Sequence, residues 1–253
     1  MFSYLTSFLP QDFSHVQWLI MGLCAVLIGL NKTALPGVGI VVVPLLASFF
    51  SARTSTGLIL PMLALADLFA VGYYHRHANW KIILKLLPAA LVGIAVGSYV
   101  IRKINDDTLR PVIGIIVLIM VILNYLREKH IKQDFSQSKI FASSMGFIAG
   151  LTTQLANAAG PVMAIYLLAM KLPKYEFIGT GAWYFLILNW LKMAIFASEG
   201  RITTQSMAAD ISMLPLIAIG AIAGIFILKK VPQKWFNFFV QILAAAAAIK
   251  LLF

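Results

Sequence analysis

The sequence predicts an all-α integral membrane protein with two inverted-topology repeats, each a broken helix or hairpin followed by three transmembrane helices. Three observations lead to this prediction. Hydrophobic residues make up 61% of the 253 residues, charged residues only 11%, and the mean hydropathy is +0.91. Apolar runs of about 18 to 25 residues, long enough to cross a hydrocarbon core, recur along the chain. Their order repeats once, and polar residues interrupt the first run of each half.

The composition also excludes several classes of function. A net charge of +11 would suggest nucleic-acid binding in a soluble protein, but here the basic residues cluster in short loops between apolar runs, as orientation signals do. The single cysteine, Cys24, has no intrachain partner for a disulfide. No Ser/His/Asp order, phosphate loop or cluster of metal ligands occurs within the spans. We therefore expect no nucleic-acid partner, no metal, no cofactor and no enzymatic activity.

The first repeat is expected over residues 16–126 of a single transmembrane domain that covers 1–253. It begins with apolar segments on either side of a break within Gly29 to Pro44, GLNKTALPGVGIVVVP. Unwound backbone persists at membrane depth only where protein or a water-filled cavity satisfies its polar groups. The expected segments are 16–30 and 40–50 around the break, then 54–74, 84–101 and 109–126.

A polar stretch, 127–139, is expected to be a cytoplasmic linker, and the second repeat follows over 140–253. Its expected segments are 140–151 and 161–170 around a second break, then 175–198, 207–228 and 235–253. Several residues recur at fixed offsets, which indicates internal duplication. The pairs at an offset of 127 are Pro88 with Pro215, Gly93 with Gly220 and Gly97 with Gly224, and those at 121 are Gly29 with Gly150 and Gly39 with Gly160.

The basic residues also indicate how the repeats are oriented. If each break is a helical hairpin that returns to its side of entry, twelve basic loop residues lie on one face of the membrane and six on the other. If each broken segment crosses once, nine basic residues lie on each face, and the positive-inside rule then indicates no orientation. We therefore expect hairpins, both termini outside, and halves of opposite orientation, which is a common plan of secondary transporters.

The two breaks are the predicted substrate site. A half-helix that begins at each break would direct its free N–H groups and its positive dipole end into a cavity, which suits an anion. Lys32 would add a formal positive charge. The alternative is that proline and glycine only kink a packed helix while Lys32 extends to an interface. The predicted binding residues are Asn31, Lys32, Thr33, Gly37 and Gly39 from the first break, and Thr152, Thr153, Gln154, Asn157 and Gly160 from the second.

Asp67 is predicted to take part in coupling or in an ion pair, because a carboxylate within a span is costly without a partner. Its near counterpart in the second half is Asn189, with Lys192 one turn further on. We expect Asp67 to be paired with Lys32 or Lys192, protonated, or in contact with water. A functional and a purely structural ion pair both fit the sequence.

With its duplicated length and its breaks at Gly29 to Pro44 and Gly150 to Pro161, the chain resembles the sulfite exporter TauE/SafE family over nearly its whole length. Many members have a glycine-rich run at each break, whereas LPGVG and LANAAGP keep only some of these glycines. The resemblance implies a transporter of sulfite, organosulfonates or related small anions in a bacterial inner membrane.

The leading interpretation is thus a secondary transporter that moves a small oxyanion by alternating access between inverted halves. The partners that fit it are the anion, the lipid bilayer, protons as a coupling ion and a second copy of the chain in a homodimer. The alternative is a non-transporting membrane accessory or assembly protein, which predicts that packing fills both breaks.

Overall fold

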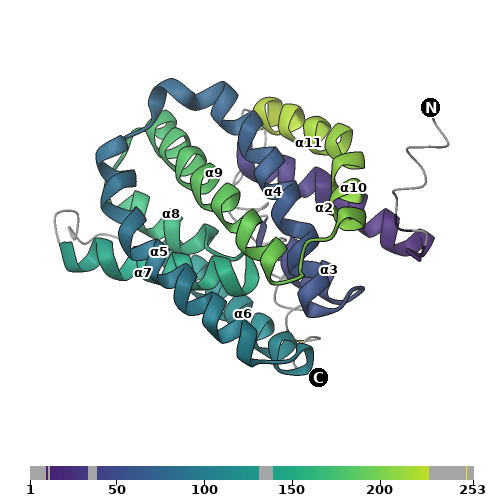
Figure 1. The fold of residues 1–253 in the computed structure, drawn as a ribbon. Helices are drawn as coiled ribbons and strands as arrows, with labels where there is room; N and C mark the ends of the chain where they lie inside the picture. The colour runs from purple at the N-terminus through teal and green to yellow at the C-terminus, as the bar shows by residue number, and fades with distance from the viewer. Residues whose placement is uncertain (1–9, 11, 34–38, 131–138, 228–248, 250–253) are drawn as a thin grey trace.

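Every regular element is a helix in the computed structural model, which describes residues 10, 12–33, 39–130, 139–227 and 249 (Figure 1). The elements are α2 (His15–Thr33), α3 (Gly39–Ala47), α4 (Ala52–Tyr74), η1 (His75–His77), α5 (Trp80–Lys103), α6 (Asp106–His130), α7 (Lys139–Ala156), α8 (Gly160–Ala169), α9 (Lys174–Ser198), α10 (Thr204–Ser212) and α11 (Leu214–Ile227). Gly37, most of the predicted linker and all of the predicted segment 235–253 except residue 249 lie outside the described residues.

Four of these helices, α2, α4, α5 and α9, are long and apolar enough to cross a membrane, and α10 with α11 forms a fifth, bent candidate. Apolar side chains on their outer surfaces, such as Leu19, Leu84 and Ile222, are exposed. In water such a surface would be unfavourable, but in a bilayer it faces lipid tails. The chain is therefore a multi-pass membrane protein.

The first predicted hairpin is present as α2 and α3. At the open end, the side-chain amide of Gln17 donates to the carbonyl of Phe49 at 3.0 Å. The rings of Phe13 and Phe50 lie there with centroids 5.0 Å apart. The start of α2 thus lies beside the end of α3, and the chain returns to the side from which it entered.

The second hairpin is α7 with α8. Phe141 near the start of α7 stacks on Tyr166 near the end of α8, with ring centroids 5.6 Å apart. At the tip, the break is only three residues long, 157–159. The described residues next to the two breaks, Asn31 and Gly39 in the first hairpin and Asn157 and Gly160 in the second, line one common pocket.

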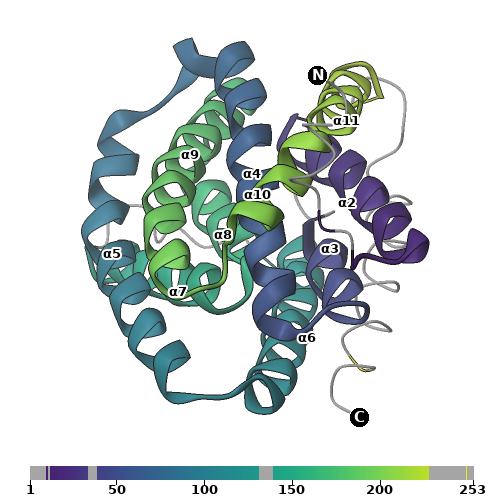
Figure 2. The ribbon, with the colours of Figure 1, turned by 45° about the vertical axis from the view of Figure 1, so that its right-hand side comes forward.

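The corresponding helices of the two halves, α4 and α9, pack together in the centre (Figure 2). A Cβ on Gly57, near the start of α4, would lie 1.9 Å from the carbonyl oxygen of Arg201, just after the end of α9. At the other end, Tyr74 of α4 lies against Tyr175 of α9, with ring centroids 6.3 Å apart. The two helices are therefore antiparallel.

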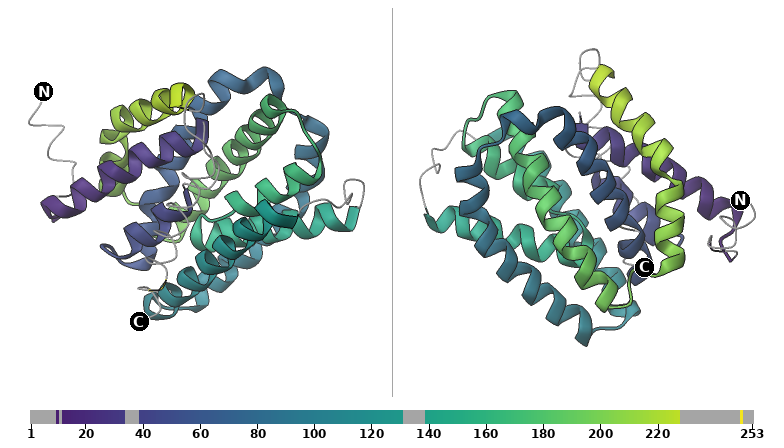
Figure 3. Two further views of the ribbon diagram at one scale, coloured as in Figure 1. Left: turned by 180° about the vertical axis from the view of Figure 1, so that it is seen from behind. Right: turned by 45° about the horizontal axis from the view of Figure 1, so that its top comes forward.

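Each hairpin packs most extensively on a helix of the other half: α2 on α11, and α7 on α5, at opposite sides of the α4–α9 pair (Figures 1 and 3). A Cβ on Gly93 would lie 2.2 Å from the Phe147 carbonyl oxygen, and a Cβ on Gly220 would lie 2.2 Å from that of Val26. The glycines differ by 127 in number and their partners by 121, the offsets found in the sequence. The same close contact therefore occurs once in each half.

These glycine contacts predict an effect on stability. Gly93→Ala should destabilise the fold by about 1–3 kcal/mol, because the new methyl group would overlap a backbone oxygen that cannot rotate away. The measurement is thermal unfolding in detergent. Gly72→Ala is the matched control, because no heavy atom lies within 4 Å of the position that a Cβ would take on this helical glycine, and it should keep or raise the melting temperature. Equal melting temperatures for the two variants would contradict the packing role.

The predicted segment 207–228 is not a single straight helix. The structure breaks this segment at Met213, between α10 and α11, with a bend of 44°. Pro215 explains the break, because proline has no N–H to donate to the preceding turn and its ring crowds that turn's carbonyl. Its sequence counterpart Pro88 lies within the unbroken helix α5, so the repeated proline has different consequences in the two halves.

Candidate functional site

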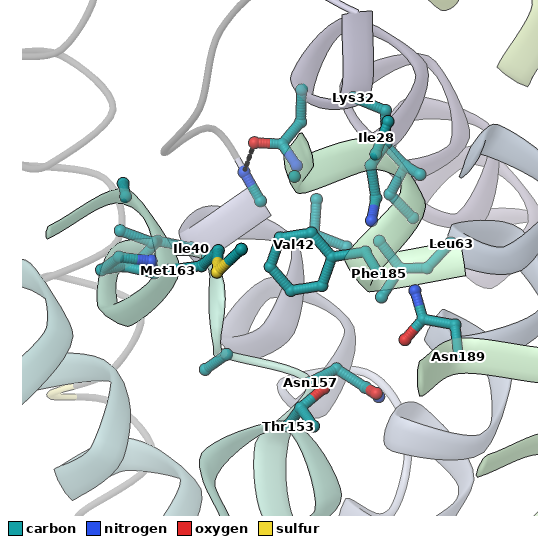
Figure 4. Close-up of a pocket in the computed structure, with 18 of the residues that line it drawn as sticks. Ile28, Lys32, Ile40, Val42, Leu63, Thr153, Asn157, Met163, Phe185 and Asn189 are labelled. Atoms are coloured by element: carbon teal, nitrogen blue, oxygen red, sulfur yellow. Dashed lines mark hydrogen bonds between the residues drawn. The ribbon is translucent and has the colours of Figure 1, made fainter. Parts of the chain in front are cut away.

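A pocket lies between the two hairpin tips (Figure 4). Seven predicted site residues line it: Asn31, Lys32, Gly39, Thr153, Asn157, Gly160 and Asn189. Most of the remaining wall is apolar and comes from α2, α3, α4, α8 and α9, with Val42, Leu63, Met163 and Phe185 among its residues. The expected polar pocket is therefore a mixed one, in which a few polar groups are set into apolar walls, as is usual for small-ligand sites.

The second tip is shaped by the end of α7 and the start of α8. Asn157 has φ of +52°, a left-handed conformation that asparagine tolerates better than most residues, and it ends α7. Its N–H still donates to the carbonyl of Thr153 at 3.0 Å. Gly160 and Pro161 then begin α8 and line the pocket, so that the positive end of the α8 dipole faces the cavity.

Lys32, in the last turn of α2, forms a buried ion pair across the pocket wall. Its Nζ lies 2.6 Å from Oδ1 of Asp67, and the side chains are 9% and 0% exposed. Asn189 donates to the other carboxylate oxygen of Asp67 at 2.7 Å. The Lys32 ammonium also lies 4.5 Å from the centroid of Phe185, whose ring stands in the middle of the pocket view (Figure 4). Of the expected partners of Asp67, the structure thus selects Lys32.

Lys192 is the second buried lysine, and its partners are neutral. Its Nζ donates to Oγ1 of Thr153 at 2.8 Å and to Oδ1 of Asn157 at 2.7 Å. The amide of Asn157 is itself fixed, because it donates to the carbonyl of Thr56 at 2.9 Å. Within the described part of the chain, no carboxylate lies at salt-bridge distance from Lys192, which is fully buried. Lys192 therefore lies directly behind two residues that line the pocket.

The charges around the pocket do not balance when both lysines are ionised. Lys32 is matched by Asp67, whereas Lys192 has hydrogen bonds but no counter-ion among the described residues. Removing an ion from water costs several kcal/mol unless an opposite charge and hydrogen bonds compensate for the loss. A small anion in the pocket would supply the missing negative charge.

Three predicted site residues point elsewhere. The hydroxyl of Thr33 donates to the carbonyl of Ala221 at 2.8 Å, that of Thr152 donates to its own helix, and the amide of Gln154 donates to Glu199. For Thr152 and Gln154 the physical reason is that α7 continues to Ala156, so successive residues point in directions about 100° apart. Only Thr153 of the run 152–154 therefore faces the pocket.

A buried cluster of ionic and polar side chains at the end of α9 was not predicted. It consists of Arg201, Glu199, Gln154 and Ser98. Arg201 Nη1 lies 3.2 Å from Oε2 of Glu199. The Glu199 carboxylate also accepts hydrogen bonds from Gln154 and Ser98. Burial lowers the pKa of Arg201 to about 10, and Glu199 opposes this shift, so Arg201 stays charged at neutral pH. The signal that could have revealed the cluster is the Glu-Gly-Arg sequence directly after a predicted span.

Asp210, within the predicted segment 207–228, was also missed. It is fully buried in α10, and neither of its carboxylate oxygens has a hydrogen-bond partner within the part of the chain that the structure describes. Over the described ranges, no group of three or more histidine, cysteine, aspartate or glutamate side chains is placed to hold a metal ion.

Two comparisons of the sequence with known proteins bear on the identity of the chain. No curated protein matches the chain in a sequence search. The family model described as sulfite exporter TauE/SafE matches residues 21–251, which include all the pocket residues, the whole second hairpin and the first hairpin from Met21 onward. The chain belongs to the sulfite exporter TauE/SafE family.

Proposed function

We propose that the protein is a secondary transporter that binds a small oxyanion in the pocket between the hairpin tips and moves it by alternating access. One observation supports this most strongly: Lys192 is buried against the pocket wall and has no counter-ion among the described residues, next to a Lys32–Asp67 pair that is already neutral. An accessory protein would have no reason to keep such an uncompensated charge in its core.

Several groups would bind the anion. Lys32 lines the pocket and would contact the anion directly, while the start of α8 would contribute backbone N–H groups. Thr153 and Asn157 would donate or accept hydrogen bonds. Lys192 would attract the anion through its charge from the far side of these two residues, to which it donates hydrogen bonds. The apolar walls would exclude water and so strengthen each charged hydrogen bond.

Alternating access is supported by the antiparallel arrangement of α4 and α9 and by the glycine contacts that recur in both halves. On α9, the pocket is lined from Phe177 to Asn189, toward the end at which this helix begins. The opposite end holds the Arg201–Glu199 pair. We infer a state in which the site is closed at the Arg201 end. The twelve-to-six charge split favours a cytoplasmic location for the face at which α9 begins.

The family description points to sulfite as the first substrate to test, and organosulfonates present the same oxyanion head. The test is uptake of ³⁵S-sulfite into proteoliposomes, with competition by ethanesulfonate, sulfate and acetate, at several pH gradients. We expect saturable, protein-dependent uptake that sulfite and a sulfonate reduce more than acetate does. The absence of flux for every anion, with protein that is folded by size-exclusion chromatography, would favour an accessory role.

Binding alone should be visible without transport. A ligand at one hundred times its Kd stabilises a folded protein by about 2.7 kcal/mol, so sulfite should raise the melting temperature in detergent. Chloride at the same ionic strength is the control for a general salt effect. An equal shift with chloride and sulfite would show that no oxyanion site is formed.

A further inference from the structure

We propose that Arg201 forms a second oxyanion site, which receives the anion between the pocket and the face of the membrane at which α9 ends. This inference rests on the proposed transport function. Nothing in the family match concerns Arg201 beyond its lying in the matched range.

The guanidinium of Arg201 has an unused binding edge. Its Nη1 donates to the carbonyl of Gln154 and to Glu199, each at 3.2 Å. Among the described residues, its Nε and Nη2 have no hydrogen-bond partner, although the side chain is fully buried. These two nitrogens form one side of the planar fork, which can bind two oxygens of a carboxylate, sulfonate or phosphate group at once. A tetrahedral or pyramidal oxyanion would therefore satisfy both donors.

Arg201 is linked to the pocket by an aromatic ring. The guanidinium carbon lies 3.4 Å from the centroid of Phe196, and the ammonium of Lys192 lies 5.2 Å from the same centroid. Lys192 in turn binds two residues of the pocket wall. Lys32, Lys192 and Arg201 thus form a series of buried cations that starts in the pocket and leads toward the end of α9.

Glu199 would hold Arg201 in place while no anion is bound. It is the one carboxylate within salt-bridge distance of Arg201 among the described residues, and Ser98 of α5 and Gln154 of α7 donate to it. Arg201 does not line the pocket, so an anion reaches it only after the helices around this cluster separate. In that state the oxyanion would bind Nε and Nη2 of Arg201. Glu199 would compete with the oxyanion for the guanidinium.

The test compares transport from the two faces of the membrane. Right-side-out and inside-out vesicles that contain the full chain are supplied with ³⁵S-sulfite on the outside only, and the apparent KM is measured for each. Arg201→Gln should raise the KM for sulfite supplied at the face where α9 ends by about tenfold, as expected for the loss of a charged hydrogen-bonding pair. The KM for sulfite supplied at the other face should change by less than about twofold. The matched control is Arg102→Gln, which removes an exposed charge in the last turn of α5.

Glu199→Gln separates a binding role from a structural one. If Arg201 binds the anion, removing its competitor should lower the KM at the face where α9 ends, the opposite sign to Arg201→Gln. A purely structural ion pair predicts that both variants lose stability and that transport falls equally from both faces. That result, or an unchanged KM in folded Arg201→Gln, would overturn the second site. An absence of sulfite flux in the unmodified protein would instead reject the proposed function itself.

Discussion

Replacing Lys32 with methionine should abolish anion transport and also destabilise the fold. The ammonium of Lys32 lies in the pocket wall, 2.6 Å from the fully buried Asp67. Removing it leaves a buried carboxylate without its cation, which costs about 3–5 kcal/mol. The anion would lose a direct contact that is worth at least about 2 kcal/mol, or roughly thirtyfold in affinity. Sulfite flux and thermal unfolding measure the two effects.

A double variant separates these effects. Lys32→Met with Asp67→Asn removes both charges, so the melting temperature should return toward that of the unmodified protein. Transport should stay lost, because the pocket still lacks its cation. Recovery of flux in the double variant would show that Lys32 serves only to neutralise Asp67.

Replacing Lys192 with methionine should abolish transport while the fold remains intact. Lys192 has two neutral partners, Thr153 and Asn157, so its removal leaves no carboxylate uncompensated. The site loses the charge that we propose the anion neutralises, with an expected decrease in sulfite affinity of roughly thirtyfold or more. The loss of melting temperature should be clearly smaller than for Lys32→Met.

Lys85→Met is the control for removing a lysine, because Lys85 is exposed on α5. It should keep the flux of the unmodified protein. Unchanged flux in folded Lys192→Met, measured beside this control, would mean that the buried lysine has no part in transport.

The sequence was sufficient to locate two breaks whose flanking residues line one pocket. Polar and glycine residues within apolar runs are rare in hydrocarbon, so Asn31 and Lys32 on one side and Thr153 and Asn157 on the other marked the two tips. The sequence also indicated that Asp67 needs compensation, because an isolated charge at that position is too costly, but it left an ion pair, protonation and contact with water as alternatives. Each of these inferences depends on local composition and on the cost of burial alone.

The direction of a side chain near a helix end depends on where the helix stops, and the sequence did not determine this. Thr152 and Gln154 were assigned to the pocket because a longer break was expected after residue 151, but α7 continues for another turn. The stop at Asn157 arises from a left-handed backbone that few sequence signals specify.

Contacts between distant elements were also beyond prediction. Arg201 meets Glu199 locally, but Ser98 and Gln154 join them from α5 and α7 only in the folded chain. Phe185 was likewise one of many aromatic residues in a predicted span, and only the fold places its ring against Lys32. Long-range packing therefore decides which of these side chains come together around the pocket and around Arg201.

An oxyanion between the hairpin tips can be located directly with selenite, a heavier analogue of sulfite, in a crystal structure of the protein. The proposed function predicts an anomalous selenium peak in the pocket, within hydrogen-bonding contact of Lys32 and of the start of α8, and no such peak in Lys32→Met/Asp67→Asn crystals. At a selenite concentration that inhibits sulfite uptake, a pocket without selenium density would contradict the proposal that this is the transport site.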